Sequence, residues 1–128
     1  MGYTIQEQVD GAFAEVVEKT IDALEGEGFG VLCDIDVQAT FAKKLDREFR
    51  RYRILGACNP ELAYEGLEDE IELGALLPCN VIVYETDEGT VAVSAVDPNR
   101  LVGMADNPDL DPIAEDVSDR FERVLDSL

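Results

Sequence analysis

The sequence predicts an α+β domain whose strands and helices follow one another in the rough order β-α-β-α-β-α-β-β-α. Two observations lead to this prediction. Apolar residues recur at helical spacing in stretches that are delimited by glycines or by an Asn-Pro pair. Between these stretches lie short runs rich in Val, Ile and Tyr, which are typical of strands. Because the 128 residues contain no internal repeat or composition break, we expect a single domain over residues 1–128.

The first helix is predicted from apolar residues that recur at helical spacing between Val9 and Leu24. Asp10 is its candidate N-cap, and Gly26 and Gly28 supply its end. We therefore expect a helix that starts just after Asp10 and stops before Gly28.

A strand and a short helix should follow. Apolar residues alternate with smaller or polar ones over residues 29–35, as in a strand with one buried face. This alternation places Cys33 on the core face. Asp36 is the expected N-cap of a short helix between Val37 and Leu45.

A second buried strand over residues 52–58 is predicted to lead directly into the next helix. Asn59 is suited to the N-cap position and Pro60 to the first helical position. The apolar spacing continues this helix to Ile71.

A β-hairpin and a terminal helix complete the prediction. Residues 79–86 and 90–96 are β-rich, and the Asp-Glu-Gly sequence at 87–89 suits a short hairpin turn. Residues 97–109 carry two Pro-containing triplets and are expected to form a loop. The apolar stripe over residues 110–125 predicts a long helix.

The chain is strongly acidic, with 29 Asp and Glu against 10 Lys and Arg and a formal net charge of −19. The carboxylates are spread over the expected helices and turns, so we interpret them as a solvated surface. This acid-rich, lysine-poor surface looks like that of cytoplasmic proteins from salt-loving organisms, which salt protects by screening self-repulsion. Nucleic acid is not expected as a partner, because the surface would repel phosphates.

Two absences limit the chemistry and the compartment. The chain has no histidine, which removes the commonest general base and metal ligand. Its three cysteines are an odd number without a signal peptide, which favours a reducing cytoplasm over a secreted disulfide scaffold. No stretch approaches the roughly 20 apolar residues of a membrane span, so we expect no membrane partner.

A basic cluster interrupts the acidic surface at residues 43–53. Its members are Lys43, Lys44, Arg47, Arg50, Arg51 and Arg53. Arginine forks could bind a small anionic ligand in bidentate fashion. Runs of charge are more often solvated faces, however, so ion pairing within the chain or across a dimer interface is the favoured interpretation.

Two cysteines are each followed by asparagine, in Cys58-Asn59 and Cys79-Asn80. Cys58 precedes a helix N-terminus, whose free amides and dipole would lower the pKa of its thiol, and Arg53 could add positive charge nearby. Should the two strands be neighbours, the thiols could bind a soft metal ion such as Cu(I) or form a redox pair. The alternative is that the cysteines are small core residues and the asparagines are caps, which is the commoner arrangement.

The helix after Cys58 offers one further candidate. Tyr64 lies one turn past Pro60 and could face the Cys58 pocket as an auxiliary polar group. The carboxylates of the same helix lack the spacing of an oxygen-ligand metal site, so we interpret them as solvated surface.

Four segments together resemble the family called domain of unknown function 302 (DUF302): GFGVL at 28–32, IDVQAT at 35–40, YRILGACNP at 52–60 and LPCNV at 77–81. The resemblance implies a small antiparallel sheet packed by helices, similar to the TATA-binding-protein-like fold, often in homodimers. It implies no established activity, and a shared topology does not carry DNA binding with it. Cys33 stands where the family suggests threonine, which argues against a role for Cys33 in a shared site.

We therefore expect a cytoplasmic homodimer that binds a small ligand or a soft metal ion. The binding residues would be Cys58, Asn59, Cys79, Asn80, Arg53 and Tyr64, with Cys58 and Cys79 as metal ligands. Two alternatives stay open. One is a thiol-dependent oxidoreductase in which Cys58 attacks and Cys79 resolves, and the other is a structural or interaction module with no site chemistry. The sequence does not identify a cofactor.

Overall fold

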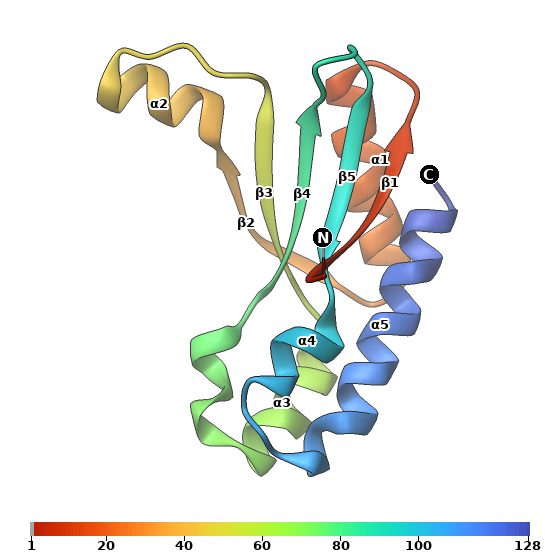
Figure 1. Ribbon diagram of the computed structural model, residues 1–128. Coiled ribbons are helices and arrows are strands. Elements are labelled where there is room, and N and C mark those ends of the chain that lie inside the picture. Colours follow the sequence, from red (N-terminus) through yellow and green to blue (C-terminus); the bar gives the residue numbers. More distant parts are fainter. Residues whose placement is uncertain (1) are drawn as a thin grey trace.

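The computed structural model describes residues 2–128 (Figure 1). The strands are β1 (Thr4–Val9), β2 (Gly30–Asp36), β3 (Tyr52–Cys58), β4 (Cys79–Glu85) and β5 (Val91–Val96). The α-helices are α1 (Phe13–Gly26), α2 (Val37–Leu45), α3 (Pro60–Asp69), α4 (Pro98–Gly103) and α5 (Asp111–Asp126). Two 3-10 helices, η1 (Ile71–Leu76) and η2 (Pro108–Leu110), follow α3 and precede α5.

The five strands form one sheet in the order β1-β5-β4-β3-β2, and every neighbouring pair is antiparallel. The predicted α+β class, with an antiparallel sheet packed by helices, is confirmed. In Figure 1, α1 lies behind the sheet and α5 runs beside it. The core between these layers comes from alternate strand positions such as Leu55, Val81, Val83 and Val93, all of which are almost fully buried.

The two long helices bury the stripes that the sequence predicts. In α1 the buried positions include Val16 and Leu24, and in α5 they include Phe121, whose ring lies 4.9 Å from that of Phe29. The predicted start of α1 was wrong. Val9 belongs to β1, where it pairs with Val91, and α1 begins only at Phe13 without a side-chain cap, so Asp10 does not cap it.

The predicted core position of Cys33 was also wrong. A β-bulge in β2 shifts the register between Val31, which pairs with the core residue Ala57, and Cys33, which pairs with Gly56. The extra residue is Leu32, and it moves every later side chain of β2 to the opposite face. Cys33 is therefore exposed, on the face of the sheet away from α1 and α5.

The predicted caps of the next two helices are confirmed. The Asp36 carboxylate accepts a hydrogen bond from the Ala39 amide at the start of α2, at 2.9 Å. The Asn59 side chain caps α3, in which Pro60 is the first residue. Gly89, with a φ of +83°, closes the turn between β4 and β5.

Residues 97–109, which were predicted as a loop, contain the short helix α4. Asp97 caps α4 by accepting a hydrogen bond from the Asn99 amide at 3.0 Å, and Pro98 occupies its first position. Packing explains why this segment is ordered, since Val102 joins a second buried cluster with Leu73 and Leu110. This cluster closes the end of the sheet at which β3 finishes and β4 begins.

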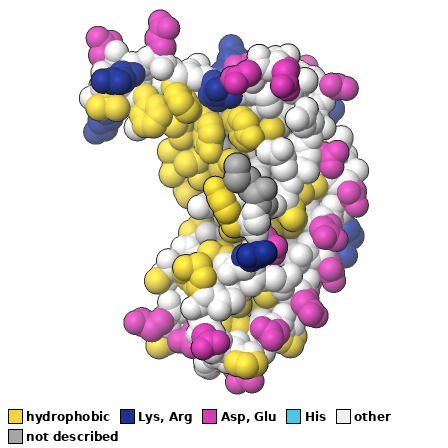
Figure 2. Space-filling view, in the orientation of Figure 1, with side chains coloured by type: hydrophobic (Ala, Val, Ile, Leu, Met, Phe, Trp, Pro, Cys, Tyr) yellow, Lys and Arg dark blue, Asp and Glu magenta, His cyan; other side chains and the backbone are white. Residues whose placement is uncertain are grey.

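Figure 2 shows that the molecule is hollowed on one side, between α2 and the end that carries α3 and η1. Hydrophobic side chains gather in the part of the hollow next to α2. In the part of the chain that the structure describes, no helix has the length and apolar character needed to cross a membrane.

Candidate functional site

Two of the three cysteines line the same cavity. Cys58 is the last residue of β3 and Cys79 is the first residue of β4. In the register of these two strands, Cys79 pairs with Ala57, the residue before Cys58. The cavity has a volume of about 40 Å³ and lies where the second buried cluster meets the end of the sheet. Asn59 also lines it, so the structure brings together three of the six predicted site residues.

The remaining cavity wall is apolar. It consists of Phe29, Ala57, Leu62, Ala63, Leu73, Leu77, Pro98, Val102, Ile113, Ala114 and Val117. A volume of about 40 Å³ exceeds the roughly 10 to 15 Å³ that one water molecule occupies by this measure. It is far below the roughly 300 to 1,000 Å³ of sites for organic ligands. The cavity therefore suits a single ion or a ligand of very few atoms.

The pKa values of both thiols are raised. Burial raises the pKa of the Cys58 thiol above its ordinary value of 9.0. Burial, and secondarily the negative charge of a Cys58 thiolate, raise the pKa of Cys79 from 9.0 to about 11. Both thiols of the cavity therefore hold their protons more tightly than an ordinary cysteine does.

The predicted lowering of the Cys58 pKa was therefore wrong. Cys58 does precede the N-terminus of α3, but the first free amides of this helix are not all available to it. The Asn59 side chain already accepts a hydrogen bond from the Leu62 amide, at 3.2 Å. Burial against the apolar wall disfavours the thiolate and raises the pKa of Cys58 instead.

Asn59 has a structural role that the sequence predicted and a second that it did not. Besides capping α3, its side chain packs against Gly28, which has a φ of +87°. A Cβ atom at Gly28 would lie 3.0 Å from Asn59 Nδ2 and 3.2 Å from a guanidinium nitrogen of Arg120. The end of α1, the start of α3 and α5 therefore meet at this point beside the cavity.

Arg53 does not reach the cysteines. It lies five residues before Cys58 in β3, a separation of about 17 Å at the usual rise of a strand. Its guanidinium donates hydrogen bonds to both carboxylate oxygens of Asp34, one of them from Nε at 2.7 Å. The expectation that Arg53 favours a thiolate at Cys58 has no geometric support.

Tyr64 and Asn80 also lie outside the cavity. The Tyr64 side chain is 68% exposed and borders a shallow acidic depression with Glu65 and Asp109. Asn80 pairs with Gly56 and is exposed, on the face of the sheet away from α1 and α5. Neither side chain lines the wall around Cys58.

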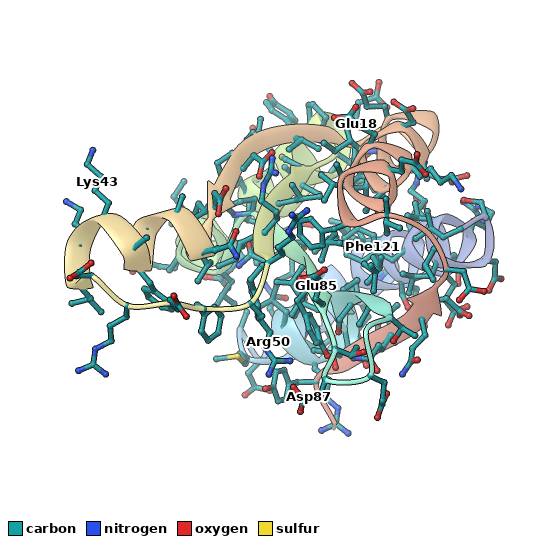
Figure 3. The ribbon with its side chains drawn as sticks, turned by 90° about the horizontal axis from the view of Figure 1, so that it is seen from above. Glu18, Lys43, Arg50, Glu85, Asp87 and Phe121 are labelled. Carbon is teal, nitrogen blue, oxygen red and sulfur yellow. The ribbon has the colours of Figure 1, made fainter. Side chains whose placement is uncertain are left out.

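The basic cluster at residues 43–53 is partly engaged in ion pairs. Arg50 contacts Asp87 at 2.7 Å and donates a hydrogen bond to the Glu85 carbonyl, and Figure 3 shows these three residues grouped together. Arg53 pairs with Asp34. Within residues 2–128, no ion pair engages Lys43, Lys44 or Arg47.

Sequence reasoning missed the cavity wall that α4 and α5 supply. Pro98 and Val102 come from the segment predicted as a loop, and Ala114 and Val117 come from the terminal helix. A signal for α4 was present, because Asp97-Pro98 repeats the cap-and-proline pattern of Asn59-Pro60. The described residues contain no group of three or more His, Cys, Asp or Glu side chains that could hold a metal ion.

Comparison with known proteins identifies a family and a solved structure of similar fold. The sequence model of the family described as "Domain of unknown function DUF302" matches residues 5–128. The crystal structure of the uncharacterized conserved protein DUF302 from Bacillus stearothermophilus is 32% identical and covers 98% of both chains with a TM-score of 0.91. No curated protein matches the sequence.

Proposed function

The chain belongs to the DUF302 family, whose name states no activity, and from the geometry of its cavity we propose that it is a soft-metal-binding module. Cys58 and Cys79 are the two proposed ligands. The observation that carries the proposal is that both thiols line one small apolar cavity.

The donor set favours a soft ion. Thiolates prefer Cu(I) to harder ions, and a site with two sulfur atoms, no imidazole and no clustered carboxylates suits linear coordination. The cavity volume of about 40 Å³ leaves room for an ion but not for an organic ligand. Its apolar wall would keep competing water away from the metal.

The raised thiol pKa values set the proposed pH dependence. Metal binding must displace the protons of Cys58 and Cys79, and both thiols hold their protons more tightly than an exposed cysteine does. Only a metal ion with a strong preference for thiolate ligands competes well with these protons. The apparent affinity should increase as the pH rises toward the thiol pKa values.

The same pKa values count against the oxidoreductase alternative. An attacking cysteine needs a populated thiolate near neutral pH, and burial opposes this at Cys58. An anionic ligand would bind at the basic cluster of residues 43–53 instead, but Arg50 and Arg53 of this cluster are already engaged in ion pairs with Asp87 and Asp34. The three cysteines are all free, which fits the reducing cytoplasm that we propose as the compartment.

The test is a Cu(I) competition titration of the folded protein in concentrated KCl, with a chromophoric Cu(I) chelator and a reductant that contains no thiol. We expect one Cu(I) per chain. Cys58→Ser and Cys79→Ser should each lower the affinity by more than about tenfold, as the loss of a ligand requires. Cys33→Ser is the matched control, because Cys33 is exposed and outside the cavity, and its affinity should equal that of the wild type.

Two results would overturn the proposal. One is that the wild-type protein does not compete with the chelator, and the other is that Cys33→Ser weakens binding as much as the cavity variants do. Thermal unfolding of Cys58→Ala and Cys79→Ala, measured without metal, tests the remaining alternative, which is a structural module with no site chemistry. If these variants lose stability while the wild type binds no Cu(I), the cysteines are core residues and nothing more.

A further inference from the structure

A second recess lies on the face of the sheet opposite α1 and α5, which we call the uncovered face. This face carries Tyr52 and Ile54 of β3, whereas α1 and α5 pack on the face that carries Leu55. The recess is a groove of about 480 Å³ between α2 and the sheet. Unlike the cavity at Cys58, it falls within the range of roughly 300 to 1,000 Å³ that is usual for organic ligands.

The wall of this groove is mainly apolar. Three aromatic side chains, Phe41, Phe49 and Tyr52, line it together with branched aliphatic ones from β2, β3 and α2. Thr40 also lines it, but the Thr40 hydroxyl already donates a hydrogen bond to the Asp36 carbonyl, at 2.8 Å. The groove therefore suits the apolar part of a ligand, and Figure 2 shows hydrophobic side chains gathered next to α2.

The aromatic wall is held in place by contacts within the chain. Phe41 lies 5.1 Å from Phe49, and Phe49 lies 6.1 Å from Tyr52, as measured between ring centroids. The Gln38 side chain donates a hydrogen bond to the Phe49 carbonyl at 3.0 Å, which ties the segment after α2 to the first turn of this helix. The groove is therefore formed before a ligand binds, which lowers the entropy cost of binding.

One lysine lies on the helix face that forms the groove. The groove residues of α2 are Val37, Thr40 and Phe41, at the i, i+3, i+4 spacing of a single face. Lys44 is the next position on this face, one turn beyond Thr40 and Phe41. Its side chain is exposed, and no ion pair engages it within residues 2–128. An apolar wall and an available positive charge therefore follow one another along α2.

We propose that this groove binds a medium-chain fatty acid as a single molecule, with the alkyl chain against the apolar wall and the carboxylate at Lys44. The groove and the proposed metal cavity share no lining residue, so this is a second site. An alkyl chain fills the apolar recess, and a carboxylate at its end gives Lys44 a partner.

Charge complementarity selects an anionic head group. The basic cluster at residues 43–53 contains six basic and two acidic side chains, whereas the rest of the chain contains four basic and 27 acidic ones. A single carboxylate at Lys44 meets mainly the charge of this cluster, because salt screens the more distant acidic surface. An anionic bilayer, or a second copy with a net charge of −19, would also face that acidic surface and be repelled.

The experiment is calorimetric titration of the metal-free full chain with octanoate, below the concentration at which octanoate forms micelles. It uses the lowest KCl concentration at which the protein stays folded, since salt weakens an exposed ion pair. We expect one octanoate per chain. The affinity should rise about three- to fourfold for each CH₂ group added from hexanoate to decanoate, as burial of the alkyl chain requires.

Lys44→Glu tests the head-group contact. It should weaken octanoate binding by about three- to tenfold, because it replaces an attraction by a repulsion, and Lys44→Arg should keep the affinity. Lys43→Glu is the matched control with the same change of charge on the same helix. Lys43 lies about 100° around α2 from Lys44, and Figure 3 shows it at the outer end of the helix, pointing away from the body. Its affinity for octanoate should stay within about twofold of the wild type.

1-Octanol separates the head group from the alkyl chain. It has the same chain without a charge, so its affinity should be equal for the wild type and Lys44→Glu. Cys58→Ser should bind octanoate as the wild type does, whether or not the wild type binds Cu(I), so the two proposals fail independently.

Three results would overturn the proposal. They are a wild type that does not bind octanoate, an affinity that does not depend on chain length, and equal weakening in Lys43→Glu and Lys44→Glu. If octanoate does not bind, co-sedimentation with phosphatidylglycerol vesicles and sedimentation velocity identify the other occupant of the uncovered face, a bilayer or a second copy.

Discussion

Arg53 of β3 holds both carboxylate oxygens of Asp34 on the neighbouring strand β2. This two-point ion pair is about 30% exposed on each side, and it raises the pKa of the Arg53 guanidinium through the hydrogen bond to Asp34. The pair ties an edge strand to the sheet beyond the β-bulge, at the point where β2 turns into α2.

Arg53→Lys should destabilise the protein modestly and leave the cavity unchanged. A lysine keeps the charge but loses the bidentate geometry, so we expect a decrease of about 0.5 to 1 kcal/mol in the free energy of unfolding. Denaturant unfolding measures this loss. The alkylation pH profile of Cys58 should not move, because Arg53 is remote from the cavity, and a shifted profile would restore Arg53 as a site residue.

Cys79 should make the protein less stable at alkaline pH. The unfolded thiol releases its proton near pH 9.0, whereas the folded thiol holds it to about pH 11. Between these values unfolding releases a proton, so the free energy of unfolding falls as the pH rises from about 9 to about 11. The contribution is fully present below pH 9, and its loss is at most roughly 2 to 3 kcal/mol.

The measurement for this prediction is urea unfolding at a series of pH values for the wild type and Cys79→Ala. Tyrosines and lysines also titrate in this range, so only the difference between the two proteins reports Cys79. The wild type should lose more stability than Cys79→Ala between pH 9 and 11. If the free energy of unfolding fell equally with pH in both proteins, the result would contradict the burial of an un-ionised Cys79 thiol.

Gly56 allows close packing on the uncovered face of the sheet. A Cβ atom at this position would lie 2.6 Å from Cys33 Sγ and 2.9 Å from Pro78 Cγ. Gly56→Ala should therefore cost about 1 to 3 kcal/mol of unfolding free energy. Cys33→Ala in the same chain should recover part of the loss, because it removes the closer of the two atoms.

The matched control for Gly56→Ala is Gly103→Ala, since a Cβ atom at Gly103 in α4 meets nothing within 4 Å. This variant should be as stable as the wild type or slightly more stable, because alanine is the better helix former. Thermal unfolding of Gly56→Ala, Cys33→Ala, their double variant and Gly103→Ala checks the set. Additive effects of Gly56→Ala and Cys33→Ala would rule out the contact.

Salt should stabilise the folded chain. Of the 29 carboxylates, only four take part in ion pairs within residues 2–128, so most of the acidic surface is uncompensated. The Debye length falls from about 10 Å at 0.1 M to about 3 Å at 1 M salt, and the self-repulsion falls with it. The melting temperature should rise with KCl over this range. Sucrose, which does not screen charge, is the control, and an equal effect of sucrose would argue against electrostatic repulsion.

The order of strands and helices was predictable because each element keeps one hydrophobic period over its length. The errors in this prediction, at Cys33 and at the start of α1, have local causes. The alternation over residues 29–35 assumed an unbroken register, and the β-bulge at Leu32 reverses it for Cys33. The start of α1 was placed too early because Val9 fits the helical spacing, although it pairs with Val91 in the sheet.

Only the part of the candidate site that is formed by residues adjacent in sequence was predictable. The Cys58-Asn59-Pro60 sequence indicated a strand end and a helix cap, and both are present. The sign of the thiol pKa shifts was not predictable, because it depends on walls from α4 and α5, remote in sequence. The exclusion of Arg53 from the site also needed three-dimensional positions. Arg53 and Cys58 are only five residues apart in sequence, but five residues of an extended strand span about 17 Å.

The basic cluster on and after α2 also concentrates the bonds that a trypsin-like protease recognises. Six of the ten lysines and arginines lie within residues 43–53, a segment that contributes nothing to the two buried clusters. A cut there would separate β2 from β3 along the chain but not in the sheet, where their ladder from Gly30 to Asp36 remains intact. The nicked protein would therefore stay together as two fragments, with the Cys58 and Cys79 cavity entirely in the C-terminal fragment except for Phe29.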